Sequence, residues 1–141
     1  MQAVATWRRG HEILLQDGRA HQVVVDLPPE GGGSSAGTTA LELSLLSLAG
    51  SLASTFVTLA RKHRQDFSGL TLALEGDPFP TDSTSPREIR GTLRVRSRVD
   101  RAEIEGTFRT ALESCPAARL FRDGHVAVNV EVVVSPAVRT P

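Results

Sequence analysis

The stretch TALELSLLSLAGSLASTFVTLARKHR, residues 39–64, decides the fold of this chain. Thr39 and Glu42 match a capping box, in which a hydroxyl residue is followed three positions later by a glutamate, so a helix is expected to begin there. No charged residue occurs between positions 43 and 60, and a basic run from Arg61 to Arg64 follows. The stretch therefore predicts a long helix, from Thr39 to about Arg64, that is covered on most of its sides.

An uncharged helix of this length has a second interpretation, because a membrane span needs a similar run of apolar residues. Several residues of the run, however, carry hydroxyl groups: Ser44, Ser47, Ser51, Ser54, Thr55 and Thr58. Strand patterns also occur on both sides of the helix. These features favour a core helix that packs closely against another helix over a transmembrane segment.

Short strands are predicted before the helix at residues 3–7, 11–15 and 20–26, with Asp17-Gly18 as a typical hairpin turn. After the helix, apolar and polar residues alternate over 67–75 and 89–97, and valines alternate strictly over 125–135. Asp100 is a candidate cap for a second helix. That helix carries an apolar stripe of Ile104, Phe108, Ala111, Leu112 and Cys115.

Pro116 interrupts the second helix, and Gly124 closes a further short turn before the last strand. The order is three strands, a long helix, two strands, a second helix and a strand. Antiparallel strands joined by hairpins, with helices on one face, form an α+β layout. The sequence predicts one such domain over residues 1–141.

The composition narrows the classes of function. Sixteen basic and sixteen acidic side chains cancel, and only 4% of residues are aromatic, which argues against a nucleic-acid or anionic-membrane partner. The single cysteine, Cys115, excludes an intrachain disulfide, and residues 1–10 hold no apolar core of signal-peptide length. We therefore expect a cytoplasmic protein.

Other candidate sites have ordinary structural explanations. The glycine-rich segment 30–38 lacks the spacing of a phosphate-binding loop, and the four histidines show no ligand spacing, so neither a cofactor nor a metal is expected. Arg90, Arg94 and Arg96 share a strand face that could attract an anion, although a solvated face is the simpler interpretation. Glu42 is better explained by helix capping than by catalysis.

Several segments together resemble the OsmC/Ohr family, named after osmotically inducible protein C and organic hydroperoxide resistance. The resemblance rests on Asp26-Leu27-Pro28-Pro29 with Gly31-Gly32, on Gly37-Thr38-Thr39-Ala40-Leu41-Glu42-Leu43, on Leu48-Ala49-Gly50-Ser51, on Ser114-Cys115-Pro116 and on the early Trp7. It covers most of the chain. The helix segment and the Cys-Pro pair are specific in combination.

The resemblance implies an intertwined homodimer with two long helices packed at its centre. Members of this family reduce organic hydroperoxides in the stress response, with a reactive cysteine near the middle of the long helix. A second cysteine, before a proline on the other helix, resolves the sulfenic acid to a disulfide. Some members take electrons from lipoylated proteins.

The sequence departs from this pattern at the reactive position, where Ser51 follows Leu48-Ala49-Gly50. A serine hydroxyl ionises far less readily than a thiol and has no sulfur to oxidise. The activating glutamate of Ohr-type members would fall on Leu41, and the activating arginine has only Arg8, Arg9 and Arg19 as candidates. The two-cysteine cycle is therefore not expected here.

Cys115 and Ser51 each have two interpretations. Cys115 would cap the turn that Pro116 begins, where the helix dipole lowers a thiol pKa, or it is a small buried apolar residue. Ser51 is expected to bond a carbonyl oxygen one turn earlier, with orientation of a ligand over Cys115 as the alternative.

Three functions follow from these residues. The first is a catalytically silent dimer that binds a small apolar or lipoyl-like ligand in the family pocket. The second is a one-cysteine hydroperoxide reductase that uses Cys115 and an external thiol. The third is a structural or regulatory dimer that has no ligand.

Overall fold

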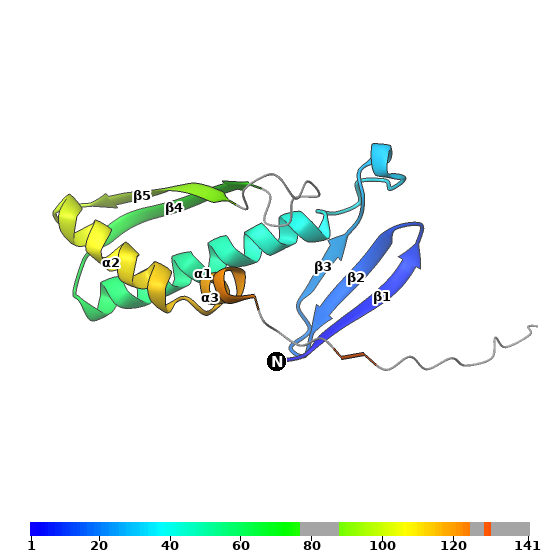
Figure 1. The fold of residues 1–141 in the computed structure, drawn as a ribbon, viewed down its shortest axis with the longest axis horizontal. Helices are drawn as coiled ribbons and strands as arrows, with labels where there is room; N and C mark the ends of the chain where they lie inside the picture. Colours follow the sequence, from blue (N-terminus) through cyan, green and yellow to red (C-terminus); the bar gives the residue numbers. More distant parts are fainter. Residues whose placement is uncertain (77–87, 125–128, 131–141) are drawn as a thin grey trace, which may run out of the picture.

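A computed structural model describes residues 1–76, 88–124 and 129–130 of the chain (Figure 1). Its elements follow the predicted order: β1 (Ala3–Arg9), β2 (Glu12–Asp17), β3 (Gln22–Val25), α1 (Ala40–Lys62), β4 (Phe67–Gly76), β5 (Ile89–Ser97), α2 (Arg101–Ser114) and α3 (Pro116–Asp123). A short 3-10 turn, η1 (Pro29–Gly31), lies before α1. The valine-rich strand predicted at 125–135 lies outside the described residues, apart from positions 129 and 130.

The three N-terminal strands form an antiparallel sheet of order β1-β2-β3. Its register places Trp7, Ile13, Leu15, Val23 and Val25 on one face, called the apolar face below, whereas Val4, Leu14 and Val24 lie among polar residues on the other face. Trp7 pairs with Ile13, and Ile13 pairs with Val25, so these three side chains point to the same side. The predicted turn is present, because the Asp17 carboxylate accepts hydrogen bonds from the backbone N–H groups of Arg19 and His21. This sheet stands apart from the helices in Figure 1.

The long helix begins where the capping box predicted. The Thr39 hydroxyl accepts the Glu42 N–H at 3.2 Å, and the Glu42 carboxylate accepts the Thr39 N–H at 2.7 Å. One face of α1, formed by Leu48, Leu52, Phe56 and Ala60, is buried. This face packs against β4, α2 and α3, as expected of a core helix. The expectation that most sides of the helix are covered is not met in the single chain, because only 22% of its apolar window is buried, and the helix is long and apolar enough to cross a bilayer.

The strands β4 and β5 pair in antiparallel register and cover one side of α1. Leu70, Leu72, Leu93 and Val95 of this pair pack inward against two groups of buried residues. Arg90, Arg94 and Arg96 are exposed, as the solvated-face interpretation predicts. The α+β fold class is confirmed, with the described strands arranged in two sheets, of three and two strands.

The second predicted helix is divided into α2 and α3 at Pro116, and two expectations about it need correction. Asp100 occupies the N-cap position of α2, but its side chain makes no capping hydrogen bond. The predicted stripe is also only partly covered: Ala111 and Cys115 are fully buried, whereas Leu112 is 39% exposed. The reason is that α1 covers one side of this stripe and leaves the other side open.

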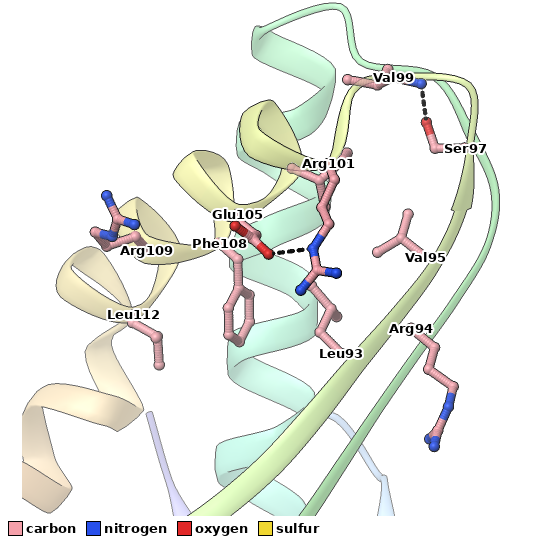
Figure 2. Close-up of a pocket in the computed structure, with 11 residues that line it drawn as sticks. Leu93, Arg94, Val95, Ser97, Val99, Arg101, Glu105, Phe108, Arg109 and Leu112 are labelled. Atoms are coloured by element: carbon pink, nitrogen blue, oxygen red, sulfur yellow. Dashed lines mark hydrogen bonds and ion pairs between the residues drawn. The ribbon is translucent and has the colours of Figure 1, made fainter.

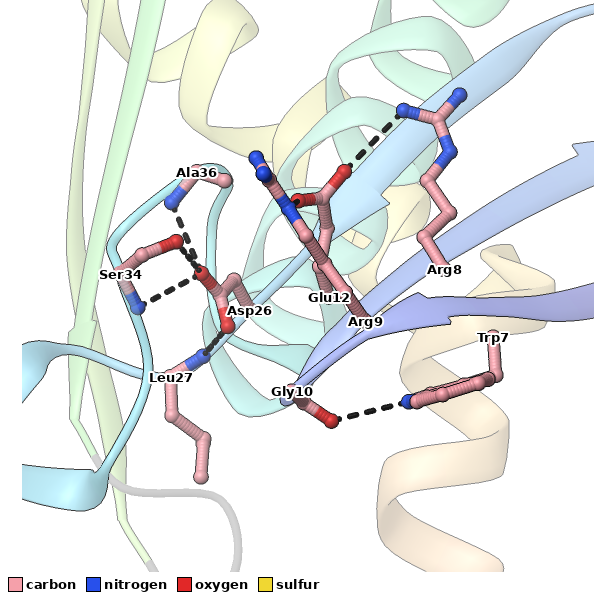
Figure 3. A network of polar contacts seen from close by, with 9 residues as sticks. All are labelled: Trp7, Arg8, Arg9, Gly10, Glu12, Asp26, Leu27, Ser34 and Ala36. Carbon is pink, nitrogen blue, oxygen red and sulfur yellow. Dashed lines mark hydrogen bonds and ion pairs between the residues drawn. The ribbon is translucent and has the colours of Figure 1, made fainter.

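The glycine-rich connection is organised by Asp26, which is buried (Figure 3). Its carboxylate accepts the N–H groups of Leu27, Ser34 and Ala36, together with the Ser34 hydroxyl. These hydrogen bonds keep the pKa of Asp26 well below its usual range, with the Ala36 bond as the largest cause. The amides that a phosphate would need are therefore occupied by a carboxylate of the chain itself.

Candidate functional site

The candidate site is centred on Cys115, which ends α2 and caps α3. Pro116 occupies the first position of α3, where its missing N–H costs nothing and its fixed φ suits a helix. Cys115 itself has an extended backbone, with φ −64° and ψ 121°, and its side chain is 0% exposed. The thiol thus sits at the N-terminal end of a helix, inside the core.

Ser51 lies opposite Cys115 on the long helix. Its Oγ is 3.1 Å from the Cys115 Sγ, a hydrogen bond in which either atom can donate. We expected Ser51 to bond a carbonyl one turn earlier, but the hydrogen bond seen for its hydroxyl runs across to α2 and α3. On α1, bonds of that local kind are made by Ser44, Thr55 and Thr58 instead.

Thr55 completes the surroundings of the sulfur, and sequence reasoning did not single it out. It lies one turn after Ser51, its hydroxyl donates to the Ser51 carbonyl oxygen at 2.8 Å, and its effect on Cys115 is to lower the pKa of the thiol. The spacing of four residues between two hydroxyl side chains was the available signal, since such residues share a helix face. This spacing alone could not show that Cys115 faces the two hydroxyl groups.

Burial and hydrogen bonding act on the thiol in opposite directions. Burial raises the pKa of Cys115, whereas hydrogen bonds from the Ser51 hydroxyl, the Ala118 and Ala117 N–H groups and the Thr55 hydroxyl lower it. The net result is a pKa below the ordinary thiol value of 9.0. Both sequence interpretations of Cys115 therefore hold in part: the residue is buried, and it occupies the N-cap position of α3, although its side chain makes no capping hydrogen bond there.

An apolar cavity of about 620 Å³ lies next to this group and is called the core pocket below. Leu48, Leu52 and Ala118 pack with Cys115 and also line the core pocket. Its other walls come from β4, β5 and α2, and Arg122 is the only charged residue among the described residues that line it. The Cys115 thiol packs against these three lining residues and is not itself among the described residues that line the pocket.

The other candidate residues lie elsewhere. Arg8 and Arg9 pair with the buried Glu12 (Figure 3), and Arg19 pairs with Asp17. Within the described part of the chain, none of these three arginines contacts Cys115. Glu42 serves the start of α1, as predicted, and the Thr39 N–H is the main reason that its pKa is lowered.

Comparison with known proteins identifies the family. The model of the OsmC-like protein family matches residues 31–131, which include α1, β4, β5, α2 and Cys115. The chain belongs to the OsmC-like family. No curated protein sequence matches it.

Solved structures share the OsmC-like fold at low sequence identity. The OsmC-like protein of Mycoplasma pneumoniae is 16% identical over 86% of each chain, with a TM-score of 0.72. A Psychrobacter arcticus protein described as an osmotic stress induced and detoxification response protein is 18% identical, over 84% of this chain and 86% of that one, with a TM-score of 0.72. The organic hydroperoxide resistance protein OhrB of Bacillus subtilis is 20% identical, over 86% of this chain and 91% of that one, with a TM-score of 0.53.

Proposed function

We propose that this OsmC-like protein has lost the two-cysteine cycle of hydroperoxide reduction and binds a small apolar ligand, with lipoyl-like molecules as candidates. The observation that carries the first part is the 3.1 Å contact between Ser51 Oγ and Cys115 Sγ. A resolving cysteine must touch the residue that it resolves. The contact supports the proposal that Ser51 occupies the position of the family's reactive cysteine, and a serine cannot be oxidised as a thiol can.

The core pocket supports the second part of the proposal. Its volume of about 620 Å³ is within the usual range for small-molecule sites, and its lining is apolar apart from Arg122. It lies between α1, α2 and α3, beside Cys115. This cavity favours ligand binding over the alternative of a structural or regulatory dimer with no ligand, for which a filled core would be expected.

The substitution Ser51→Cys tests the lost redox pair. We expect the new cysteine to form a disulfide with Cys115 on mild oxidation, detected as a loss of two hydrogens in the intact mass and of both free thiols. Ser54→Cys is the matched control, because Ser54 lies on the same helix but is exposed. Failure of the Ser51→Cys variant to form this bond, with the fold intact, would contradict the assignment of Ser51.

A one-cysteine hydroperoxide reductase is the second candidate, and the lowered pKa of Cys115 favours it. The thiolate would take one oxygen from the hydroperoxide, which releases the alcohol and leaves a sulfenic acid. Two equivalents of an external thiol would then return the thiol, with water and a disulfide as products. If an organic hydroperoxide adds one oxygen to the intact mass and dithiothreitol removes it, this function replaces the silent binder.

We also propose that the protein is a cytoplasmic homodimer without a nucleic-acid or membrane partner. Large apolar side chains are exposed in the single chain, among them Trp7 at 66% and Leu46 at 58%. Trp7 lies on the apolar sheet face and Leu46 on α1, so a second copy could cover both. The balanced charge supports the absence of a nucleic-acid or membrane partner, and the single free thiol supports a cytoplasmic location.

A further inference from the structure

A second cavity lies between α2 and β5, outside the site described above (Figure 2). Thr107, Ala111 and Cys115 of the helical segment are buried, whereas Ile104, Phe108 and Leu112 are covered only in part. The latter three, with Leu93 and Val95 of β5, form the apolar floor of a groove of about 760 Å³. This α2–β5 groove exists because α2 has more apolar surface than α1 can cover.

The groove and the core pocket adjoin. Leu93, Phe108 and Leu112 line both cavities, so the two apolar surfaces meet at these side chains. Together the two cavities extend along α2 and α3, from Val99, just before α2, to Gly124, just after α3. A continuous apolar surface of this shape suits an extended chain better than a compact ring.

A cationic side chain, Arg101, lies at the end of the groove that is nearest to the start of α2. Figure 2 shows the Arg101 guanidinium above the apolar floor, near Phe108 and Leu93. Its Nε donates to the Glu105 carboxylate at 2.6 Å, which leaves the terminal Nη groups without a partner among the described residues. Glu105 thus orients Arg101 and leaves its two Nη groups able to donate to a second carboxylate.

The remaining charges at the groove add to this preference. Arg94 and Arg109 also line it, and Figure 2 shows both side chains directed outward. Arg101 and Arg109 of α2 outnumber Glu105 at the rim of this floor, whereas Arg94 points to the opposite face of β5 from Leu93 and Val95. Such a site favours an amphiphile with an anionic head over a neutral or cationic one.

We propose that the α2–β5 groove extends the core pocket and binds a straight-chain carboxylate, with its head on Arg101 and its chain along Phe108 and Leu112. This inference rests on the proposed ligand-binding function and specifies its ligand class. The exposed Arg101 contributes selectivity more than affinity, because water and salt screen its charge.

Calorimetric titration of the full chain with decanoate, 1-decanol and decyltrimethylammonium, all below their micellar concentrations, tests the proposal. We expect decanoate to bind at least about fivefold more tightly than 1-decanol at low salt, with the cation weakest. Arg101→Gln should abolish the difference between decanoate and 1-decanol. Arg98→Gln is the matched control, since it removes the same charge nearby from a residue that does not line the groove, and it should keep the difference.

The outcomes separate this inference from the function on which it rests. Equal binding of decanoate and 1-decanol would leave apolar binding in place and overturn the role of Arg101. A preference for decanoate that survives Arg101→Gln would also overturn it. Binding of no amphiphile would remove both proposals, and would leave the groove to a protein partner or a second copy of the chain.

Discussion

At the residue scale, the hydroxyl of Ser51 changes the chemistry of a thiol on another element. A buried thiolate is unfavourable unless hydrogen bonds replace the lost water. Ser51 on α1 provides such a bond to Cys115, and the Thr55 hydroxyl and two amides of α3 act on the pKa of the thiol in the same direction. The Ser51 hydroxyl on α1 thus stabilises the ionised form of the Cys115 thiol.

Removal of this hydroxyl should raise the pKa of Cys115. In Ser51→Ala, we expect the thiolate absorbance to appear at a higher pH than in the unchanged protein. Because the folded-state pKa lies below 9.0, the bond stabilises the fold above that pH and its contribution is lost as pH falls through the folded value. Ser54→Ala, on the exposed side of α1, should leave the titration unchanged; an unshifted curve in Ser51→Ala would contradict the assignment.

Asp26 provides a second prediction at this scale, for the stability of the glycine-rich connection. Asp26→Asn replaces a carboxylate oxygen that accepts N–H groups by an amide that donates, so we expect a Tm lower by roughly 5 °C. The pKa of Asp26 is lowered, so this difference should be complete at neutral pH and shrink as pH falls below 3.8. Glu30→Gln, an exposed acidic residue in the same connection, is the control for thermal unfolding.

At the element scale, α1 depends on its capped start. The capping box satisfies backbone N–H groups that no preceding turn can bond. Glu42 also accepts a hydrogen bond from the Thr38 hydroxyl, so the carboxylate joins the connection to the helix. The same helix carries Ser51 and Thr55, and its position therefore sets their distance from Cys115.

Loss of the cap should therefore reduce both stability and order at the site. We expect Thr39→Ala to lower the free energy of unfolding by about 1 kcal/mol, measured by urea denaturation. Thr39→Ser keeps the hydroxyl and should remain close to the unchanged protein. Equal destabilisation by alanine and serine would show that the Thr39 methyl group matters, and the cap does not.

At the scale of the whole molecule, the three-stranded sheet is the feature that a single chain leaves incomplete. Its strands contact one another but do not pack extensively on the helices within the described residues. Trp7 and Val23 on the apolar face are 66% and 37% exposed. A sheet with one apolar face gains its stability from whatever covers that face.

If this face forms the dimer interface, a charged substitution on it should weaken the dimer. The unchanged protein should elute as a dimer at micromolar concentration, and Trp7→Glu should shift it towards monomer by placing a charge on the apolar face. Val4→Glu is the matched control, because Val4 pairs with Gln16 on the opposite face and is also exposed, at 45%. A monomeric elution of the unchanged protein, or equal effects of both substitutions, would argue against this interface.

The elements and their order could be predicted from the sequence, because the signals for them are local. The capping box at Thr39, the hairpin turn at Asp17, the alternation over 67–75 and 89–97 and the Cys-Pro break each depend on neighbouring residues, and the structure has these four features at those positions. Even the full burial of Cys115 and the exposure of Arg94 followed from periodicity.

The contacts between those elements could not be predicted from the sequence and required the packed fold. Ser51 and Cys115 are separated by 64 positions, and no local pattern states that their side chains meet at 3.1 Å. Thr55, the core pocket and the open side of the stripe at Leu112 depend likewise on how closely α2 and α3 approach α1 and β5. Packing between distant segments sets these distances, because it depends on the shapes of both surfaces at once.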